Sequence, residues 1–184
     1  MNFAIDPVAG LVNPAHFCPS PNCDERPQSI AIDMIVVHGI SLPPGQYGND
    51  AIEDFFCNKL DYSAHPFFKT IAHLRVSAHL LIKRTGAITQ FVPFTKRAWH
   101  AGESCFKDQI ACNDFSIGIE LEGSDDVPYE PLQYQRLNDM IKLLMQAYPT
   151  IRYDRIVRHA DIAPGRKTDP GPAFNWAYLM ELLA

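Results

Sequence analysis

The segment Phe115–Glu122 (FSIGIELE) constrains the fold most strongly, because apolar and polar residues alternate along its whole length. Successive side chains of a β-strand point to opposite faces of a sheet, so this alternation predicts a strand with one face in the core. Glu120 is then expected on the face turned away from the core. A second strand is expected at Ile32–Val37 (IDMIVV), where a β-branched run ends directly before His38. We therefore expect a sheet with polar side chains at the ends of its strands.

The remaining pattern predicts a mixed α/β fold in a chain of 184 residues, a length typical of one domain. Further short strands are predicted over residues 79–84, 88–92, 97–100 and 155–159. Helices are predicted over residues 50–60, 132–148 and 173–183. Together these elements predict the α/β class: a single domain with a mixed central β-sheet of about five or six strands, flanked by helices. Residues 1–30 are expected to form an irregular arm packed on a domain that comprises residues 31–184.

Composition argues against several classes of partner and location. A net charge of −5 gives no basic face for a nucleic acid or a membrane surface. No apolar run approaches the ~18 residues of a membrane span, and the first residues lack the pattern of a secretory signal. The odd count of five cysteines then favours reduced thiols in the cytoplasm. Cys18 with Cys23 and Cys105 with Cys112 are alternatives as structural zinc half-sites, but their spacing is longer than usual, so unpaired cysteines are favoured.

Two histidines stand at the ends of predicted strands. His38 follows the first strand, and His159 ends another strand and opens a loop that contains Asp161 and Asp169. A catalytic zinc site takes three protein ligands and leaves one position open for water. The two histidines and one of the aspartates would supply those ligands, although the spacing does not choose between Asp161 and Asp169. A lone histidine is more often structural than a ligand, but two at strand ends beside a carboxylate loop favour a metal site.

Amide hydrolysis at such a site needs two further groups. One transfers the proton of the attacking water to the leaving amine, and Glu120 suits this role because of its predicted place outside the core. The other stabilises the oxyanion of the tetrahedral intermediate. Lys167 suits that role because it lies two residues before Asp169, so that in an extended backbone both side chains point the same way. Taken alone, each charge would be interpreted as a solvated surface group.

Four long segments carry a resemblance that adds to this interpretation. They are residues 36–48 (VVHGISLPPGQYG), 65–102, 112–123 (CNDFSIGIELEG) and 159–176 (HADIAPGRKTDPGPAFNW). In this order they resemble the N-acetylmuramoyl-L-alanine amidase family, which includes the peptidoglycan recognition proteins. The similarity is greatest to the cytoplasmic members that act on 1,6-anhydro-muramyl peptides in cell-wall recycling. Together the segments span most of the chain, so the resemblance is far more specific than one histidine–aspartate pair.

The resemblance implies a role for each candidate residue. It implies one Zn²⁺ per chain on His38, His159 and Asp169, with Glu120 as catalytic acid/base and Lys167 as the group that stabilises the intermediate. It implies substrate-binding positions at Trp99, Arg75, Arg166 and His100. The two arginines would hold carboxylates of the stem peptide, which arginine binds in a bidentate manner.

The activity expected from the resemblance is hydrolysis of the lactyl amide bond between (1,6-anhydro-)N-acetylmuramic acid and L-alanine of peptidoglycan stem peptides. The protein is expected to be a cytoplasmic monomer that takes a muropeptide substrate and binds neither nucleic acid nor membrane. The alternative is a non-catalytic module that binds peptidoglycan fragments, which the complete set of site residues disfavours. One position departs from the pattern: the cytoplasmic relatives carry Asn directly after the first histidine, and this chain has Gly39. That change leaves the metal ligands intact and puts one substrate contact in doubt.

Overall fold

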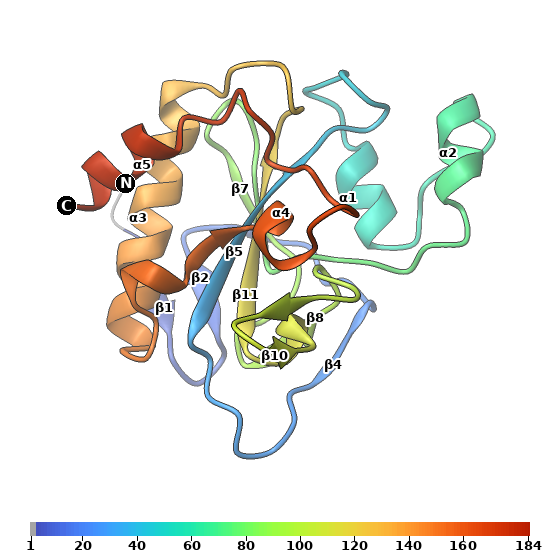
Figure 1. The fold of residues 1–184 in the computed structure, drawn as a ribbon. Coiled ribbons are helices and arrows are strands. Elements are labelled where there is room, and N and C mark those ends of the chain that lie inside the picture. Colours follow the sequence, from blue (N-terminus) through green and yellow to red (C-terminus); the bar gives the residue numbers. More distant parts are fainter. Residues whose placement is uncertain (1–2) are drawn as a thin grey trace.

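The computed structural model describes residues 3–184, which fold around a six-stranded mixed sheet in the order β12-β5-β11-β6-β7-β3 (Figure 1). Its strands are β3 (His16–Phe17), β5 (Met34–Ile40), β6 (Leu80–Ile82), β7 (Ile88–Gln90), β11 (Ser116–Glu122) and β12 (Ile156–Arg158). Strands β12, β5, β11 and β6 are parallel, whereas β7 is antiparallel to β6. The predicted α/β class, with a mixed sheet of about five or six strands flanked by helices, is confirmed.

Helices cover both faces of this sheet. Their bounds are α1 (Ala51–Phe56), α2 (Pro66–Ile71), α3 (Pro131–Ala147), α4 (His159–Ile162) and α5 (Trp176–Leu183), with 3₁₀ turns at Cys112–Asp114 and Tyr153–Arg155. Figure 1 shows α3 and α5 together on one side of the sheet, and α1 with the projecting α2 on the other. The α3 side holds the largest apolar cluster, which includes Ile35, Ile119 and Leu137. On the opposite side, Phe56 packs with Leu81 in a second cluster.

Strand β11 is buried on both faces, which differs from the expectation that its polar face lies outside the core. Ser116 is 0% exposed, Glu120 8% and Glu122 1%. The polar face is covered because strand β8 (Lys96–Ala98) and the 3₁₀ turn at Cys112–Asp114 pack against β11. Although buried, the Glu122 carboxylate has hydrogen-bond partners, because it accepts from the backbone N–H groups of Gly48 and Arg84.

The segment expected to be an irregular arm carries four short strands. Strands β1 (Ala4–Asp6) and β2 (Leu11–Asn13) form an antiparallel pair, β3 joins the central sheet beside β7, and β4 (Cys23–Glu25) pairs with β8. A further short pair is formed by β9 (Cys105–Phe106) and β10 (Gln109–Ile110). Sequence patterns do not show such strands, because two or three residues are too few to establish a period.

Helix α2 was not expected from the sequence, and α4 lies where a loop was predicted. Both are short helices of six and four residues, too short to show an apolar stripe. The five cysteines are free, with Cys57 and Cys112 buried. Within residues 3–184, no helix has the length and apolar character needed to cross a membrane.

Candidate active site

The register of the parallel strands brings the sequence-predicted residues together. His38 on β5 pairs with Glu120 on β11, and Arg158 at the end of β12 pairs with Val37. Residues in register on neighbouring strands point to the same face of a sheet, so His38 and Glu120 face the same way. Because β12 ends at Arg158 and α4 begins at His159, the chain turns at this point and places the His159 ring beside His38. The site thus lies at the carboxyl ends of three adjacent strands, a usual position in α/β proteins.

Three side-chain atoms converge at this edge of the sheet. The Nδ1 atoms of His38 and His159 are 2.9 Å apart, and Asp169 Oδ2 lies 3.3 Å from the first and 3.1 Å from the second. The three residues could hold a metal ion, and across residues 3–184 no other group of histidine, cysteine and carboxylate side chains converges in this way. His38 and His159 are buried, whereas 14% of the Asp169 side chain is exposed. Two imidazole nitrogens and one carboxylate oxygen are a ligand set typical of catalytic zinc, with one side left open.

The structure also separates the two aspartates that the sequence left as alternatives. Asp161 lies on α4 and points away from the centre, because its carboxylate accepts hydrogen bonds from the backbone N–H and the guanidinium of Arg158. Asp169 lies beyond the turn that follows α4 and reaches both histidines. Its position depends on the path of the loop, which is held where the Ala160 N–H donates to the Asp169 carbonyl at 3.1 Å.

A chain of hydrogen bonds behind His38 fixes the orientation of its ring. The Ser116 hydroxyl donates to the Cys112 carbonyl at 2.5 Å, so the same oxygen accepts from His100 Nε2–H at 3.1 Å. His100 Nδ1 is then an acceptor, and it lies 3.0 Å from His38 Nε2, which donates to it. This arrangement leaves the lone pair of His38 Nδ1 directed at the convergence point. A metal-binding histidine is commonly oriented by a partner on its other ring nitrogen.

His159 is oriented in the same manner by the backbone. Its Nε2 lies 3.2 Å from the Ala101 carbonyl, which can only accept, so Nε2 carries the proton and Nδ1 is unprotonated. Burial, with a smaller contribution from the neighbouring His159, lowers the pKa of His38 to about 4. His38 is therefore neutral at pH 7, the state that binds a metal.

The polar face of β11 supports the His38 side of this arrangement. Ser116 accepts from His100, and Gly118 leaves room for the His100 ring, since a Cβ at Gly118 would lie 2.4 Å from the ring Cγ. Glu120 follows on the same face and lines the cleft. The alternation in the sequence therefore indicates the strand correctly, while the polar half of the pattern builds the site.

Glu120 is a buried carboxylate beside the convergence point. Its Oε1 lies 4.0 Å from His38 Nδ1, and its Oε2 is buried without a hydrogen-bond partner. Burial, reinforced by the charge of Asp169, raises the pKa of Glu120 well above its usual value, and Lys167 opposes this shift. A carboxyl group with a raised pKa next to a metal site is suited to proton transfer near neutral pH.

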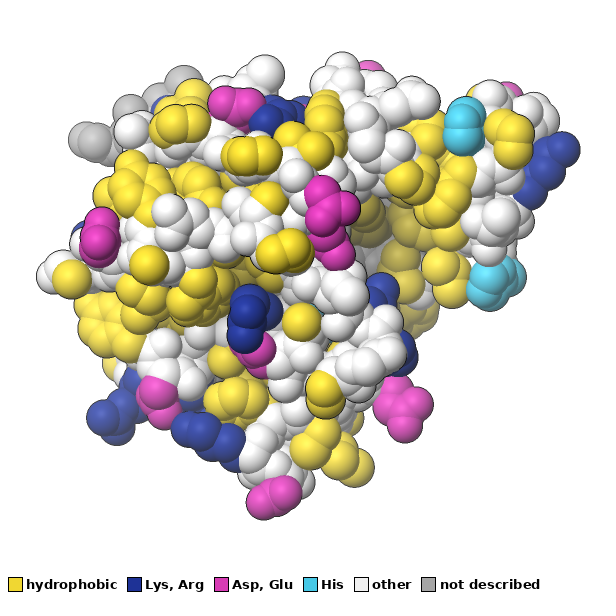
Figure 2. Space-filling view, turned by 45° about the horizontal axis from the view of Figure 1, so that its top comes forward, with side chains coloured by type: hydrophobic (Ala, Val, Ile, Leu, Met, Phe, Trp, Pro, Cys, Tyr) yellow, Lys and Arg dark blue, Asp and Glu magenta, His cyan; other side chains and the backbone are white. Residues whose placement is uncertain are grey.

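These residues line a cleft of about 180 Å³ that has one polar and one apolar wall. The polar wall includes His100, Glu120, His159, Lys167 and Asp169, and the apolar wall includes Phe55, Phe56, Leu74 and Val76. Figure 2 shows a hollow walled by hydrophobic side chains between the body of the molecule and the projecting segment. Lys167 is exposed, so its ammonium group is free to turn toward a bound ligand.

Comparison with known protein families shows to which family this chain belongs. Residues 28–172 match the family model described as N-acetylmuramoyl-L-alanine amidase. The chain belongs to this amidase family. The match covers every residue of the converging group and Glu120 and Lys167, so the site lies within the part of the chain that defines the family.

Relatives in the amidase family match along nearly the whole chain. The 1,6-anhydro-N-acetylmuramyl-L-alanine amidase AmpD of Escherichia coli K12 is 54% identical over 166 residues, which are 90% of each chain. The protein of the same name from Salmonella typhimurium SL1344 is 52% identical and covers 97% of this chain and 95% of its own. A crystal structure of a selenomethionine AmpD derivative has a TM-score of 0.94 and 49% identity, covering 98% of this chain and 99% of that one.

A more distant amidase structure contains a ligand. The Escherichia coli N-acetylmuramyl-L-alanine amidase AmiD, solved in complex with the substrate anhydro-N-acetylmuramic acid-L-Ala-D-γ-Glu-L-Lys, has a TM-score of 0.59 and 32% identity. The match covers 86% of this chain and 60% of that one. The fold of this chain is therefore shared with amidases whose substrates are muropeptides.

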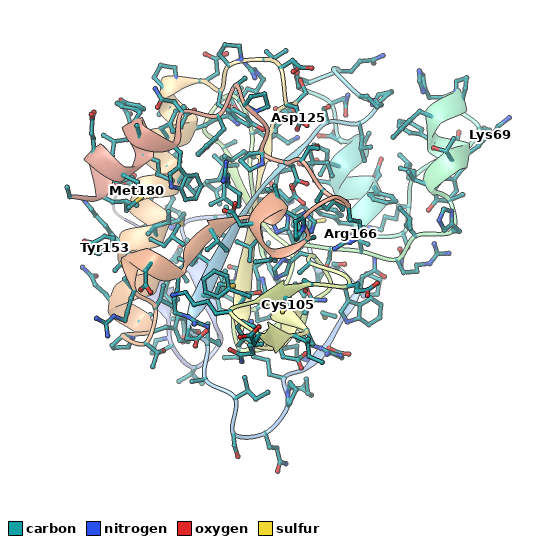
Figure 3. All side chains as sticks on the ribbon, viewed as in Figure 1. Lys69, Cys105, Asp125, Tyr153, Arg166 and Met180 are labelled. Atoms are coloured by element: carbon teal, nitrogen blue, oxygen red, sulfur yellow. The ribbon has the colours of Figure 1, made fainter. Side chains whose placement is uncertain are left out.

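The substrate-binding positions expected from the amidase resemblance occupy different places. His100 lines the cleft, but both of its ring nitrogens are engaged, by His38 and by Ser116. Arg166, labelled in Figure 3 on the loop after α4, donates to the Ala101 and Glu103 carbonyls. It borders a neighbouring cavity of about 610 Å³ beside the β9–β10 pair.

The other two positions lie near the cleft without lining it. Arg75 is exposed between Leu74 and Val76, two residues of the apolar wall, and its guanidinium donates to the Ala72 and Leu74 carbonyls. Trp99 is half-buried, and its backbone N–H donates to the Ser77 hydroxyl. The substrate-binding roles that the resemblance implies for these residues stay predictions. Sequence reasoning missed Ser116 and Gly118, which contact the His100 ring. The signal that could have found them is a small residue at each of two successive positions on the polar face of the strand.

Proposed function

We propose that this protein is a zinc-dependent amidase that hydrolyses the lactyl amide bond between 1,6-anhydro-N-acetylmuramic acid and L-alanine in soluble muropeptides. The observation that carries this proposal is the convergence of His38, His159 and Asp169 beside the buried carboxyl group of Glu120. Relatives with about half of their residues identical are named for this activity. We propose further that the protein acts as a cytoplasmic monomer in cell-wall recycling and needs neither nucleic acid nor a membrane.

The residues present fit a zinc ion. In this hydrogen-bond network both histidines carry their proton on Nε2. Two nitrogen lone pairs and one carboxylate oxygen therefore face the same point. Three converging acceptors without a proton between them repel one another unless a cation lies among them. We infer that His38, His159 and Asp169 are the ligands and that the open side faces the cleft. Bound there, zinc supplies a Lewis acid and lowers the pKa of a coordinated water to about 7.

The protein's own groups carry out the proton transfers. The cleft presents the scissile carbonyl to the attacking water, and Glu120 takes the proton that this water loses. Glu120 then gives the proton to the L-alanine nitrogen, so that the leaving amine departs neutral. The raised pKa of Glu120 favours this return step, because the carboxyl group holds a proton more readily than an exposed glutamate does. Lys167 stabilises the negative charge that develops on the carbonyl oxygen.

Two arginines favour a substrate that carries a stem peptide. Arg75 lies between Leu74 and Val76 of the apolar wall, Arg166 lies directly before Lys167, and each arginine uses only some of its N–H donors on backbone carbonyls. The remaining donors are available for carboxylates of the peptide, which arginine binds well. The apolar wall of the cleft, with Phe55 and Phe56, would contact the sugar ring and the lactyl methyl group.

Mass spectrometry of a single competition reaction tests this function. Zinc-loaded protein is incubated with equimolar anhydro-muramyl tripeptide and ordinary muramyl tripeptide, with a chelator, and with the chelator followed by excess zinc. We expect tripeptide release from the anhydro substrate, loss of release with the chelator and recovery with zinc. Equal cleavage of both substrates would replace the recycling role by a general one in murein degradation.

The alternative is a module that binds muropeptides without cleaving them. The same reaction distinguishes it, because zinc-loaded protein that binds the anhydro substrate and releases no tripeptide would support the module. The partnerless oxygen of Glu120 argues against it. A buried carboxylate oxygen without a partner costs stability, and a binding module has no use for a proton-transfer group there.

A further inference from the structure

Tyr129 lies in a slot that two glycines leave open. It lies in the loop between β11 and α3, and 6% of it is exposed. A Cβ added to Gly39 would lie 2.2 Å from the Tyr129 hydroxyl oxygen, and one added to Gly123 would lie 2.3 Å from ring Cε1. Any side chain at either position would therefore collide with Tyr129. The Tyr129 hydroxyl thus occupies the space that a side chain at Gly39, directly after His38, would fill.

The Tyr129 hydroxyl is bonded to the loop that carries Asp169. It donates to the Pro170 carbonyl at 3.0 Å, one residue after the aspartate. Burial raises the pKa of Tyr129, so the hydroxyl keeps its proton and remains a donor. The hydrogen bond spans 41 residues of sequence and ties the β11–α3 loop to the loop after α4.

A second contact holds the far end of the Asp169 loop to the same segment. The backbone carbonyl of Asp125, a residue labelled in Figure 3, accepts a hydrogen bond from the Ala173 N–H at 2.9 Å. Gly171 has φ +80°, and a Cβ there would lie 2.2 Å from Asp125 Cα, so the two loops are in direct backbone contact. Residues 123–129 thus hold the Asp169 loop at two points, and the Tyr129 contact is the one adjacent to the carboxylate.

We propose that Tyr129 is a positioning residue for the metal centre: through the Pro170 carbonyl it holds the Asp169 carboxylate within ligand distance of His38 and His159. The inference rests on the metal centre of the proposed function and extends it to a residue outside the cleft. Tyr129 does not itself line the cleft, and it contacts the lining only behind Gly39, so its effect is on metal affinity and not on the chemical step. Partners that orient ligands from outside the coordination sphere are commonly worth about 10- to 100-fold in metal affinity.

The test measures zinc affinity by competition with a chromophoric chelator in Tyr129→Phe, with Tyr134→Phe as the matched control. Tyr134 is also buried beside Phe174, and its hydroxyl accepts from the Asn175 N–H, away from Asp169. Each variant loses one buried hydroxyl bond, so both should lose similar stability in urea unfolding. We expect zinc affinity to fall about 10- to 100-fold in Tyr129→Phe and to stay within about twofold of wild type in Tyr134→Phe.

Two further measurements separate positioning from catalysis and from general destabilisation. Excess zinc should restore kcat of Tyr129→Phe to near the wild-type value. Gly39→Ala, which displaces the hydroxyl without removing it, should weaken zinc binding in the same direction. Wild-type zinc affinity in Tyr129→Phe, or equal weakening in both tyrosine variants, would overturn the proposal while leaving the amidase intact. If the wild-type protein itself binds no zinc, the proposed metal centre fails and this inference fails with it.

Discussion

Replacing Glu120 by Gln should remove most of the activity while leaving the metal centre in place. The amide has nearly the shape of the carboxyl group but cannot accept the proton of the attacking water. A positioned general base contributes about 10²- to 10⁴-fold, so kcat should fall by that factor, or about 2.7–5.4 kcal/mol of barrier. Zinc content should not change, since Glu120 lies outside the three converging atoms and 4.0 Å from His38 Nδ1.

The free energy of unfolding of Glu120→Gln should not fall with its activity. Glu120 is a buried carboxylate with one partnerless oxygen, so neutralising it should leave the free energy of unfolding unchanged or raise it. Glu122 is the matched control: it lies two residues on, on the same face of β11, and its carboxylate accepts the Gly48 and Arg84 N–H bonds. Glu122→Gln should lower the free energy of unfolding by about 1.5–3 kcal/mol, because one buried donor loses its charged acceptor.

Both variants are assayed for tripeptide release, zinc content and urea unfolding. The reasoning predicts an inactive, stable Glu120→Gln protein and a less stable Glu122→Gln protein whose remaining folded fraction cleaves normally. Retention of kcat within about threefold in Glu120→Gln would place the base elsewhere, and loss of zinc would make Glu120 a ligand. Either result would refute the role derived from its position.

Four other variants test the surroundings of the site. Ser116→Ala breaks the hydrogen-bond chain behind His38, so zinc affinity measured by chelator competition should fall about 10- to 100-fold; an unchanged affinity would mean that the chain does not orient the ring. Lys167→Met keeps the apolar stem and removes the charge, so kcat should fall about 10²- to 10³-fold at unchanged zinc content, whereas a rise in KM alone would assign it to substrate binding. Asp169→Ala should lose zinc and activity together in metal analysis and assay, and Asp161→Ala should keep both; the reverse pattern would exchange the two assignments.

Much of the fold follows from local patterns in the chain. The alternation in Phe115–Glu122 and the β-branched run before His38 indicate the two central strands, and the apolar spacing before Pro149 indicates α3. These features are visible because each extends over several residues and therefore shows a period. The histidines were also expected at strand ends. His159 does follow the end of β12, whereas β5 continues through His38 to Ile40, so His38 lies inside its strand, two residues before the end.

What the sequence cannot show depends on contacts between distant segments. The polar face of β11 was expected outside the core, but His100, 16 residues before Ser116, folds back over it. That Asp169 and not Asp161 reaches the two histidines depends on the loop path, and the Tyr129 hydroxyl is bonded to this loop at the Pro170 carbonyl. Neither contact leaves a periodic signal, because each joins single residues through a specific tertiary arrangement.

Anomalous diffraction at the zinc edge from crystals of the zinc-loaded protein tests the central claim most directly. The account predicts one strong peak per chain, bounded by His38 Nδ1, His159 Nδ1 and an Asp169 carboxylate oxygen at about 2.0–2.2 Å, with its open side toward Glu120. A peak at any other set of side chains, or no peak in protein that cleaves anhydro-muramyl peptide, would contradict it.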